Sequence, residues 1–201
     1  TVDREHLADG YAQAIVVNSG NANTCAPNGL QLARDTCGLV AEALGIRAED
    51  VLPSSTGVIA QEMSIEPFAR GIPEAAAKLA ADEAGSHDAA TAIMTTDTKP
   101  KTVELTGSNG WKIGGMVKGS GMIAPQLATM LCVITTDAVV SAGQMQAALA
   151  VAAEHSFNRI DVDGCMSTND TVLLLASGAS GVEPDKDEFL SLIHISEPTR
   201  P

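Results

Sequence analysis

The chain has 201 residues and a formal net charge of −13 at pH 7. Its length allows one large domain or two small ones, and its acidic balance leaves no basic stripe of the kind that nucleic-acid phosphates require. With one Trp, one Tyr and three Phe, the core must be filled by Ala, Val, Leu, Ile and Met, which favours closely packed layers over an aromatic-lined ligand cage.

Strand-like segments alternate with turns along the chain. Strands are expected at residues 12–18, 51–54, 101–105, 111–117, 129–136 and 171–176. Directly after the second of them, Ser55-Thr56-Gly57 predicts a turn. The third and fourth flank Gly107-Ser-Asn-Gly110, which predicts a hairpin.

Helices are expected at residues 29–44, 73–84 and 142–155. In the first, apolar residues recur with helical spacing from Leu32 to Leu44, and Gly45 supplies a stop signal. The second and third are Ala-rich, and Pro73 suits the first turn of the second. Because strands and helices mix without a regular βαβ alternation, the sequence predicts an α+β fold rather than a doubly wound sheet.

The acidic charge fits a soluble cytoplasmic protein, and the cysteine spacing indicates neither a metal site nor a disulfide framework. Cys25, Cys37, Cys132 and Cys165 show no CxxC spacing and no paired histidine, so we expect buried or half-buried free thiols. No apolar run reaches membrane-spanning length, and no signal peptide is visible.

Both ends of the sequence look unnatural. The chain starts at Thr1 without an initiator Met, and residues 190–201 resemble the translation of a sequencing-library adapter. We therefore expect residues 1–189 to form part of a domain and residues 190–201 to be a non-native tail.

The most informative segment is Lys118-Gly-Ser-Gly-Met-Ile-Ala-Pro-Gln-Leu-Ala-Thr-Met-Leu-Cys132. It places a Gly-rich loop, a Pro and a small residue before Thr129, which opens an apolar run. A threonine in this setting could attack the carbonyl of Ala128, cut the chain and become a new N-terminal residue. Its freed α-amine, with a pKa of about 8, can act as a general base for the hydroxyl beside it. The alternative is a tight turn leading into a buried strand.

Four further blocks accompany this segment. They are Val17-Asn-Ser-Gly-Asn-Ala-Asn23, Pro53-Ser-Ser-Thr-Gly-Val-Ile59, Ile93-Met-Thr-Thr-Asp-Thr98, and Phe157-Asn-Arg-Ile-Asp-Val-Asp-Gly164 with Ser167-Thr-Asn-Asp-Thr171. In this order the blocks resemble the glutamate N-acetyltransferase/ornithine acetyltransferase family of arginine biosynthesis, over about residues 1–189. The resemblance implies stacked β-sheets flanked by helices, an αββα-type sandwich that is truncated here.

The resemblance also implies roles for individual residues. Thr129 would be the nucleophile, with cleavage between Ala128 and Thr129. The hydroxyl of Thr56 and the N–H of Gly57 would form the oxyanion hole, and an ordinary Ser/Thr-rich turn is the alternative. Lys118 would bind a substrate carboxylate, unless it is a solvated lysine.

The implied substrate contacts include Thr95 and Thr129 itself. Thr96 is close enough in sequence to replace Thr95, and a strand-end threonine is the plainer interpretation of either. Two polar clusters, at residues 18–23 and 163–170, receive no catalytic role, because bracing the site and forming turns explain them equally well.

The implied activity is transfer of acetyl from N2-acetyl-L-ornithine to L-glutamate through an ester on Thr129, a double displacement. No cofactor is expected, and acetyl-CoA remains open as a second acetyl donor. The implied partners are these small molecules alone, with neither nucleic acid nor membrane. An α-chain (residues 1–128) and a β-chain (residues 129–189 here) would come from one precursor and assemble as a heterotetramer.

Three other interpretations remain open. A self-processing aminopeptidase of related fold is one, although the Lys118 loop and the block at residues 93–98 favour acetyl transfer. A phosphate cradle at Lys118-Gly-Ser-Gly121 lacks the Walker spacing and a following helix. Finally, the chain would be catalytically inert if the family's downstream Glu and C-terminal polar pair, which would lie beyond Phe189, are indispensable.

Overall fold

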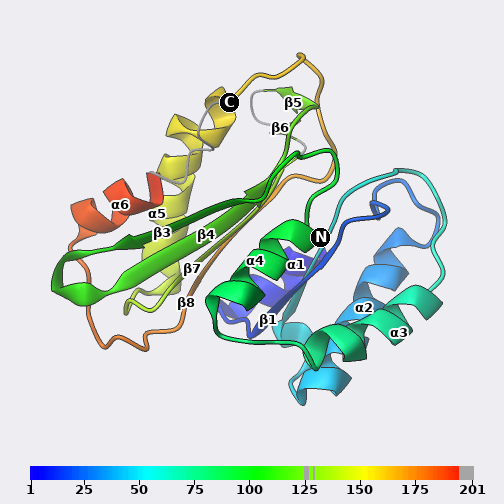
Figure 1. The fold of residues 1–201 in the computed structure, drawn as a ribbon, viewed down its shortest axis with the longest axis horizontal. Coiled ribbons are helices and arrows are strands. Elements are labelled where there is room, and N and C mark those ends of the chain that lie inside the picture. Colours follow the sequence, from blue (N-terminus) through cyan, green and yellow to red (C-terminus); the bar gives the residue numbers. More distant parts are fainter. Residues whose placement is uncertain (125–126, 129, 195–201) are drawn as a thin grey trace. The chain divides into compact units, whose positions relative to one another are not determined.

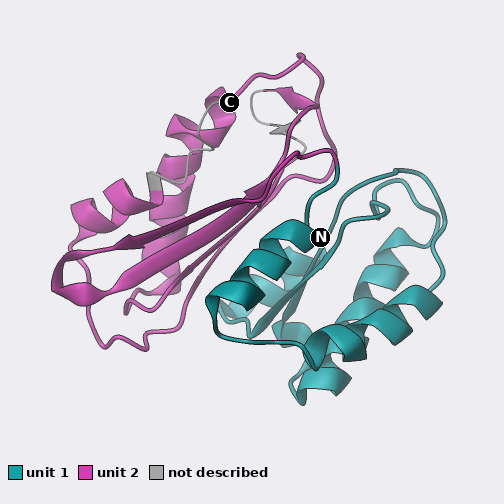
Figure 2. Ribbon diagram, in the orientation of Figure 1, with its two compact units in different colours: residues 1–95 teal, residues 96–201 magenta. Residues whose placement is uncertain are grey.

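The structure is a computed structural model that describes residues 1–124, 127–128 and 130–194. The chain divides into two compact units, Thr1–Thr95 (unit 1) and Thr96–Pro201 (unit 2), which Figure 2 distinguishes. Both units contain helices and strands (Figure 1), which confirms the α+β class. The predicted boundary between α-chain and β-chain after residue 128 is a site of peptide-bond cleavage. The division into compact units does not test it, and it stays a prediction.

Unit 1 is built on two parallel strands joined by a helix. Strand β1 (Ala14–Asn18) pairs with β2 (Val51–Ser55), and α2 (Gly29–Leu44) runs between them in the chain. Helix α2 begins and ends where the apolar spacing predicted. Gly45 follows it with a φ of 69°, the left-handed conformation that glycine adopts readily at a helix end. The buried apolar face of α2 packs against Val51 of β2.

The remaining elements of unit 1 are α1 (Val2–His6), η1 (Leu7–Asp9), η2 (Ala48–Asp50), α3 (Glu66–Ala76) and α4 (Glu83–Ala92). The helix predicted at residues 73–84 is wrong. Helix α3 starts earlier, with Pro67 in its first turn, so Pro73 lies in the helix interior, where it has no N–H to donate. Helix α4 starts after Asp82, whose carboxylate accepts the N–H of Gly85 at 2.7 Å.

Unit 2 contains, within its described residues, a four-stranded sheet in the order β3-β4-β7-β8. The strands are β3 (Lys101–Thr106), β4 (Lys112–Lys118), β7 (Leu131–Thr136) and β8 (Thr171–Ala176). The hairpin of β3 and β4 is confirmed, with η3 (Ser108–Gly110) in its turn. A separate pair joins β5 (Ile123–Ala124) to β6 (Leu127–Ala128).

Strands β7 and β8 are parallel and are connected through α5 (Ala142–His155) and η4 (Phe157–Arg159). Helix α5 spans the predicted residues. Ser141 caps it by accepting the N–H of Gln144 at 3.3 Å, and the Gln144 side chain accepts the Ser141 N–H. Each unit therefore contains one βαβ connection that the irregular sequence pattern did not reveal.

Helices α5 and α6 (Lys186–His194) lie against one face of the four-stranded sheet (Figure 1). Trp111 is fully buried between them and the sheet, and its ring centroid lies 5.8 Å from that of Phe189. Helix α6 crosses the predicted boundary at residue 189, and Ile193 is buried in the same cluster. The non-native origin of residues 190–201 stays a prediction.

Truncating Trp111 is expected to destabilise the protein by about 3–5 kcal/mol, because Trp111→Ala leaves a cavity beneath both helices. Urea unfolding of the two proteins measures the difference. Met166→Ala is the control, since Met166 is 64% exposed and its truncation should cost less than about 0.5 kcal/mol. A loss below about 1 kcal/mol for Trp111→Ala would show that this cluster does not hold the sheet and helices together.

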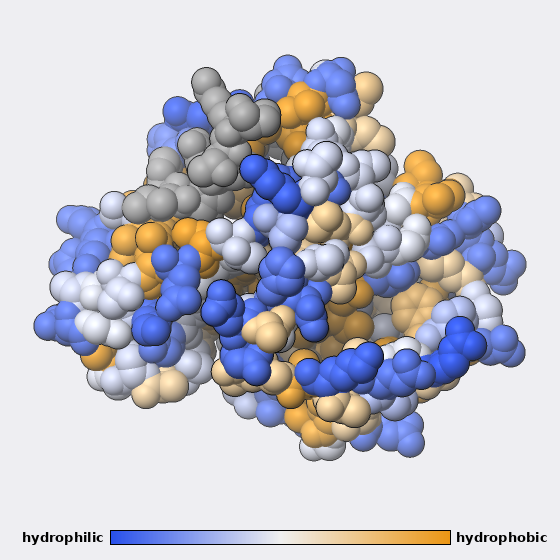
Figure 3. Space-filling model, in the orientation of Figure 1, coloured by the Kyte–Doolittle hydropathy of each residue, from blue (hydrophilic) through white to orange (hydrophobic). Residues whose placement is uncertain are grey.

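The surface seen in Figure 3 is largely hydrophilic, and the four cysteines agree only in part with the prediction of buried or half-buried thiols. Hydrophilic residues cover much of the face in Figure 3, with hydrophobic residues in small groups between them. No helix in the described ranges is both long enough and apolar enough to cross a bilayer. Cys37 and Cys132 are buried, and burial raises the pKa of each thiol to about 12. Cys25 and Cys165 are exposed, contrary to expectation.

Candidate active site

Thr56 and Gly57 follow β2 at the carboxyl end of the parallel pair. The N–H of Thr56 donates to the carbonyl of Asn18 at 2.9 Å, and the N–H of Val58 donates to the carbonyl of Gly20 at 3.3 Å. These bonds continue the pairing of β1 and β2 into the loops that follow both strands. Thr56 is consequently buried, with 2% of its surface exposed.

Gly57 occupies a position that glycine alone fits. Its φ is 122°, and a Cβ there would lie 2.1 Å from the carbonyl oxygen of Gly20. A side chain would therefore force the two loops apart. Within the described part of the chain, the N–H of Gly57 forms no hydrogen bond, whereas the N–H groups on either side of it do. A donor in this state is what an oxyanion hole needs.

The polar cluster at residues 18–23 holds this turn in place. The Ser55 hydroxyl accepts the N–H of Asn23 at 2.9 Å. The Asn18 side chain donates to the carbonyl of Asn21 at 2.8 Å and accepts the N–H of Gly20 at 3.2 Å. The residues of this cluster therefore form turns of their own, and through Ser55 they also support the loop that carries Thr56.

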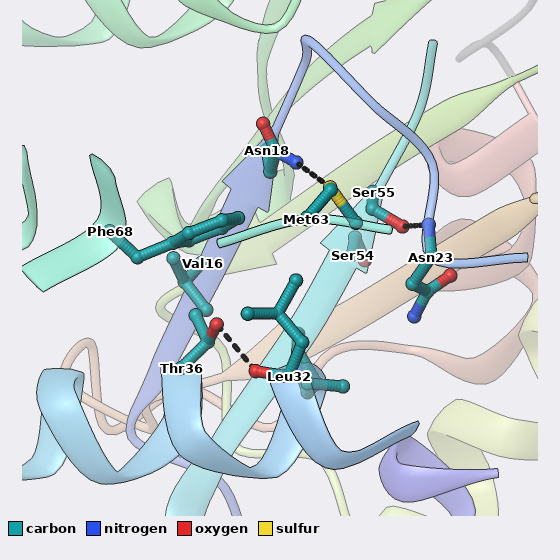
Figure 4. A pocket seen from close by; sticks show the side chains of 11 residues that line it. Val16, Asn18, Asn23, Leu32, Thr36, Ser54, Ser55, Met63 and Phe68 are labelled. Atoms are coloured by element: carbon teal, nitrogen blue, oxygen red, sulfur yellow. Dashed lines mark hydrogen bonds between the residues drawn. The ribbon is translucent and has the colours of Figure 1, made fainter. Parts of the chain in front are cut away.

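A small cavity lies beside these loops (Figure 4). Asn18, Ser55, Met63 and Phe68 are among its lining residues, and the Asn18 side chain points at the Met63 sulfur. Its volume is about 30 Å³, whereas ligand pockets measure roughly 300–1,000 Å³. A groove of about 550 Å³ between α2 and α3 includes none of the predicted site residues. The cavity is too small for the predicted substrate, and the groove does not adjoin the predicted site residues.

Lys118 ends β4 at the edge of the sheet where β7 and β8 begin. It lies opposite Leu131 of β7, which lies opposite Thr171 of β8. Only 1% of its surface is exposed, which excludes a solvated lysine. Burial lowers the pKa of its ammonium below the ordinary 10.5, and the nearby charge of Asp97 partly offsets that effect. A buried lysine with a lowered pKa is a common feature of functional sites.

The lowered pKa of Lys118 predicts a pH-dependent stability. Between its folded-state pKa and 10.5 the unfolded chain binds more protons, so the contribution of Lys118 to stability falls as pH decreases from 10.5. The free energy of unfolding of wild type minus that of Lys118→Met should therefore rise as pH increases toward 10.5. Lys112→Met, at the exposed start of the same strand, controls for loss of a positive charge. If the difference in unfolding free energy between wild type and Lys118→Met did not change with pH, the pKa of Lys118 would not be lowered in the folded state.

Asp170 lies at the same sheet edge, directly before β8. Burial raises the pKa of its carboxyl, and the charge of Lys118 acts in the opposite direction. The N–H of Thr171 donates to the carbonyl of Met130 at 3.0 Å, and Met130 follows Thr129 in the sequence. Lys118 and Asp170 therefore lie at the same edge of the sheet, where β7 and β8 begin. Thr129 itself lies outside the described residues.

Ala128, the residue before the predicted cut, pairs with Ile123 in the short β5–β6 ladder. The polar cluster at residues 163–170 supports this segment. The carboxylate of Asp163 accepts the N–H of Met122 at 2.9 Å, which lowers the pKa of that carboxyl. Ile123 and Val162 exchange two backbone hydrogen bonds, at 3.2 and 2.6 Å. A bracing role thus fits this cluster as well.

Thr95 and Thr96 fall on opposite sides of the division between the units. The hydroxyls of Thr96 and Ser120 share a hydrogen bond of 2.7 Å within unit 2. This bond occupies the Thr96 side chain, but the choice of Thr95 as substrate contact stays a prediction. The predicted site residues of unit 1 are Thr56, Gly57 and Thr95, and those of unit 2 are Lys118 and Ala128.

Three charged residues near Lys118 were not predicted, namely Asp97, Lys101 and Asp170. Asp97 and Asp170 do belong to the blocks that resemble the family, which was the available signal. Sequence spacing could not show that they meet Lys118, since the contacts span strands far apart in the chain. Among the described residues, no group of three or more His, Cys, Asp or Glu side chains could hold a metal ion.

Comparison with known sequences gives a consistent result. The sequence profile of the ArgJ family matches residues 1–196. The arginine biosynthesis bifunctional protein ArgJ of Bifidobacterium longum is 66% identical over 191 residues, covering 94% of this chain and 49% of that protein. The protein of the same name from Mycobacterium leprae is 50% identical over 189 residues, covering 91% of this chain and 46% of that protein. The chain spans about half the length of the curated relatives it matches.

Two solved structures are similar. Ornithine acetyltransferase from Mycobacterium tuberculosis, complexed with ornithine, aligns with a TM-score of 0.60 and 35% identity, over 62% of this chain and 68% of that one. The ArgJ protein of Bacillus halodurans aligns with a TM-score of 0.56 and 35% identity, over 65% of this chain and 68% of that one. Since the profile match covers nearly the whole sequence and these folds agree with it, the chain belongs to the ArgJ family.

Proposed function

We propose that the protein containing this chain is an acetyltransferase of arginine biosynthesis that moves acetyl from N2-acetyl-L-ornithine to L-glutamate. The observation that carries the proposal is the 66% identity with a Bifidobacterium longum protein named an arginine biosynthesis bifunctional protein. The similar Mycobacterium tuberculosis enzyme is named an ornithine acetyltransferase and was solved with ornithine, which supports an ornithine derivative as the acetyl donor.

The proposed reaction begins with cleavage of the chain. The hydroxyl of Thr129 attacks the carbonyl carbon of Ala128, and the amide bond between the two residues breaks to leave an ester and a free α-amine. Water then hydrolyses the ester. The products are a chain that ends at Ala128 and a chain that begins at Thr129, whose α-amine lies next to the hydroxyl that it must deprotonate.

Acetyl transfer then takes two steps on the same hydroxyl. The Thr129 oxygen attacks the acetyl carbonyl of N-acetylornithine, the amide bond breaks, and the ornithine amine leaves with a proton from the Thr129 ammonium. The amine of glutamate next attacks the acetyl ester and restores the free hydroxyl. The α-amine accepts a proton in the first half of each step and returns it in the second.

Thr56 and Gly57 are proposed to stabilise the oxyanion of each tetrahedral intermediate. The fixed turn and the N–H of Gly57 support this role, because preorganised donors need no rearrangement as charge develops. Lys118 is proposed to bind the α-carboxylate that both substrates carry, and Thr95 to contact the substrate.

The curated relatives are named bifunctional, and we propose acetyl-CoA as a second acetyl donor to glutamate. We further propose that the two chains produced by cleavage stay together, assemble as a heterotetramer and act in the cytoplasm. No resident cofactor takes part in the proposed steps.

Steady-state kinetics of the full-length protein test the proposed function. With N-acetylornithine and glutamate varied together, double-reciprocal plots should give parallel lines, as a covalent acetyl intermediate requires. Intersecting lines would reject the double displacement. Hydrolysis of peptides with no turnover of ornithine derivatives would instead identify a self-processing aminopeptidase. The 201-residue chain assayed alone shows whether this part is inert.

A further inference from the structure

The loop that follows Lys118 is held by Asp97, which precedes β3, and by Lys101, the first residue of β3. The N–H of Gly119 donates to a carboxylate oxygen of Asp97 at 2.9 Å. The carbonyl of Gly119 accepts from the ammonium of Lys101, also at 2.9 Å. Lys101 and Asp97 form an ion pair with each other through the same carboxylate oxygen. One ion pair therefore binds both backbone polar groups of a single residue, and we refer to it as the Asp97–Lys101 clamp.

The Asp97 carboxylate of the clamp is buried, and Lys101 is half-buried. The side chain of Asp97 is 1% exposed and that of Lys101 is 25% exposed. Hydrogen bonds that involve an ionised group are stronger than neutral ones, and burial strengthens them further. An exposed ion pair on the same hairpin, Lys112 with Glu104, has side chains that are 61% and 70% exposed, so it should contribute little.

The residue that the clamp holds adopts an uncommon conformation. Gly119 has a φ of 153°, where residues with a side chain rarely occur, so its freedom must be restricted by contacts if the loop is to keep one shape. A third contact, between the hydroxyls of Thr96 and Ser120 at 2.7 Å, fixes the next residue from the segment before β3. The three contacts together set the direction in which the chain leaves Lys118.

The clamp also surrounds Lys118 with charge. Asp97 favours the protonated form of Lys118 and Lys101 opposes it. Asp97 thus faces two lysines and the backbone of the residue that links Lys118 to the loop. A change at Asp97 should move that loop and alter the surroundings of the Lys118 ammonium together.

We propose that Asp97 and Lys101 are positioning residues that hold the Lys118–Gly119 segment in the geometry that chain cleavage and acetyl transfer require. This inference rests on the proposed function. Neither residue needs to touch the substrate or the reacting atoms, because both act through Gly119. Nine residues separate Lys118 from Ala128 in the sequence, and we expect a change in the direction of the chain at Gly119 to slow cleavage after Ala128.

Asp97→Asn in the full-length protein tests the inference, with Glu104→Gln as the matched control. Asparagine keeps the shape of the side chain but removes the charge that binds Lys101 and Gly119. Hydrogen exchange of the peptide that contains Gly119, followed by mass spectrometry, should accelerate by about tenfold or more for Asp97→Asn. Cleavage at Ala128 should slow by about tenfold to a hundredfold. Both rates should stay within about twofold of wild type for Glu104→Gln.

Variants of Lys101 keep the test decisive if Asp97→Asn fails to fold. Lys101→Met should accelerate exchange and slow cleavage, while Lys101→Arg should restore much of both, because it keeps the charge. Unchanged exchange at Gly119 in Lys101→Met, or an effect of Glu104→Gln as large as that of the clamp variants, would overturn the inference. A wild-type protein that cleaves itself but transfers no acetyl group would reject the proposed function and leave the exchange and cleavage measurements valid for the clamp.

Discussion

Thr129→Ala is expected to abolish both cleavage of the full-length protein and acetyl transfer. Alanine has no hydroxyl to attack the Ala128 carbonyl, and without cleavage no free α-amine is formed to act as base. Removal of a catalytic nucleophile lowers turnover by about 10⁶-fold in well-studied hydrolases, so activity should fall below detection. Denaturing electrophoresis should show a single uncut chain, and an assay of N-acetylglutamate formation should show no product.

Two further variants make this result specific. Thr129→Ser should keep part of both activities, because serine supplies a hydroxyl at the same place. Thr135→Ala changes an exposed threonine of β7 and should leave cleavage and transfer unchanged. If Thr129→Ala still produced two chains, or an uncut protein retained full activity, Thr129 would not be the nucleophile that activates the enzyme.

Thr56→Ala is expected to lower kcat by about a hundredfold or more, the usual effect of losing one oxyanion donor. The Thr56 hydroxyl should matter most when negative charge develops on the acetyl oxygen, so KM should change little. Because the same hydroxyl would assist cleavage, the measurement must use protein whose cleavage is complete. A kcat within about twofold of wild type would show that this turn has a structural role alone.

Lys118→Ala provides the contrast, because a carboxylate contact is made in the ground state and the transition state alike. The expected result is therefore a raised KM with a smaller change in kcat. If Thr56→Ala and Lys118→Ala change kcat and KM in the same proportions, the separation of roles between the two units is wrong.

Much of the fold followed from local sequence signals. The helix at residues 29–44 was predicted to the residue, because Gly45 marks its end and its apolar spacing is regular. Strand β8 and helix α5 were equally clear. The error at residues 73–84 has a local cause, because proline was taken to mark a helix start, whereas Pro73 lies inside α3 and Pro67 occupies the first turn.

The sequence indicated individual candidate residues of the site, but not the contacts between them. Thr56 and Gly57 were proposed as site residues from a turn signal and a family resemblance. The clash that a Cβ at Gly57 would make with Gly20 became visible only when β1 and β2 were paired. Asp97 and Lys101 were missed because their partner, Gly119, lies 22 and 18 residues away. Such contacts depend on strand register, which periodicity alone does not specify.

The most direct test of the central claim is the intact mass of the full-length protein, measured before and after incubation with N-acetylornithine. The account predicts two chains, the second beginning at Thr129, and a mass increase of one acetyl group on that second chain alone. Addition of glutamate should remove the acetyl group and yield N-acetylglutamate. A single uncut chain that is fully active, or an acetyl group carried by any residue other than Thr129, would contradict the account.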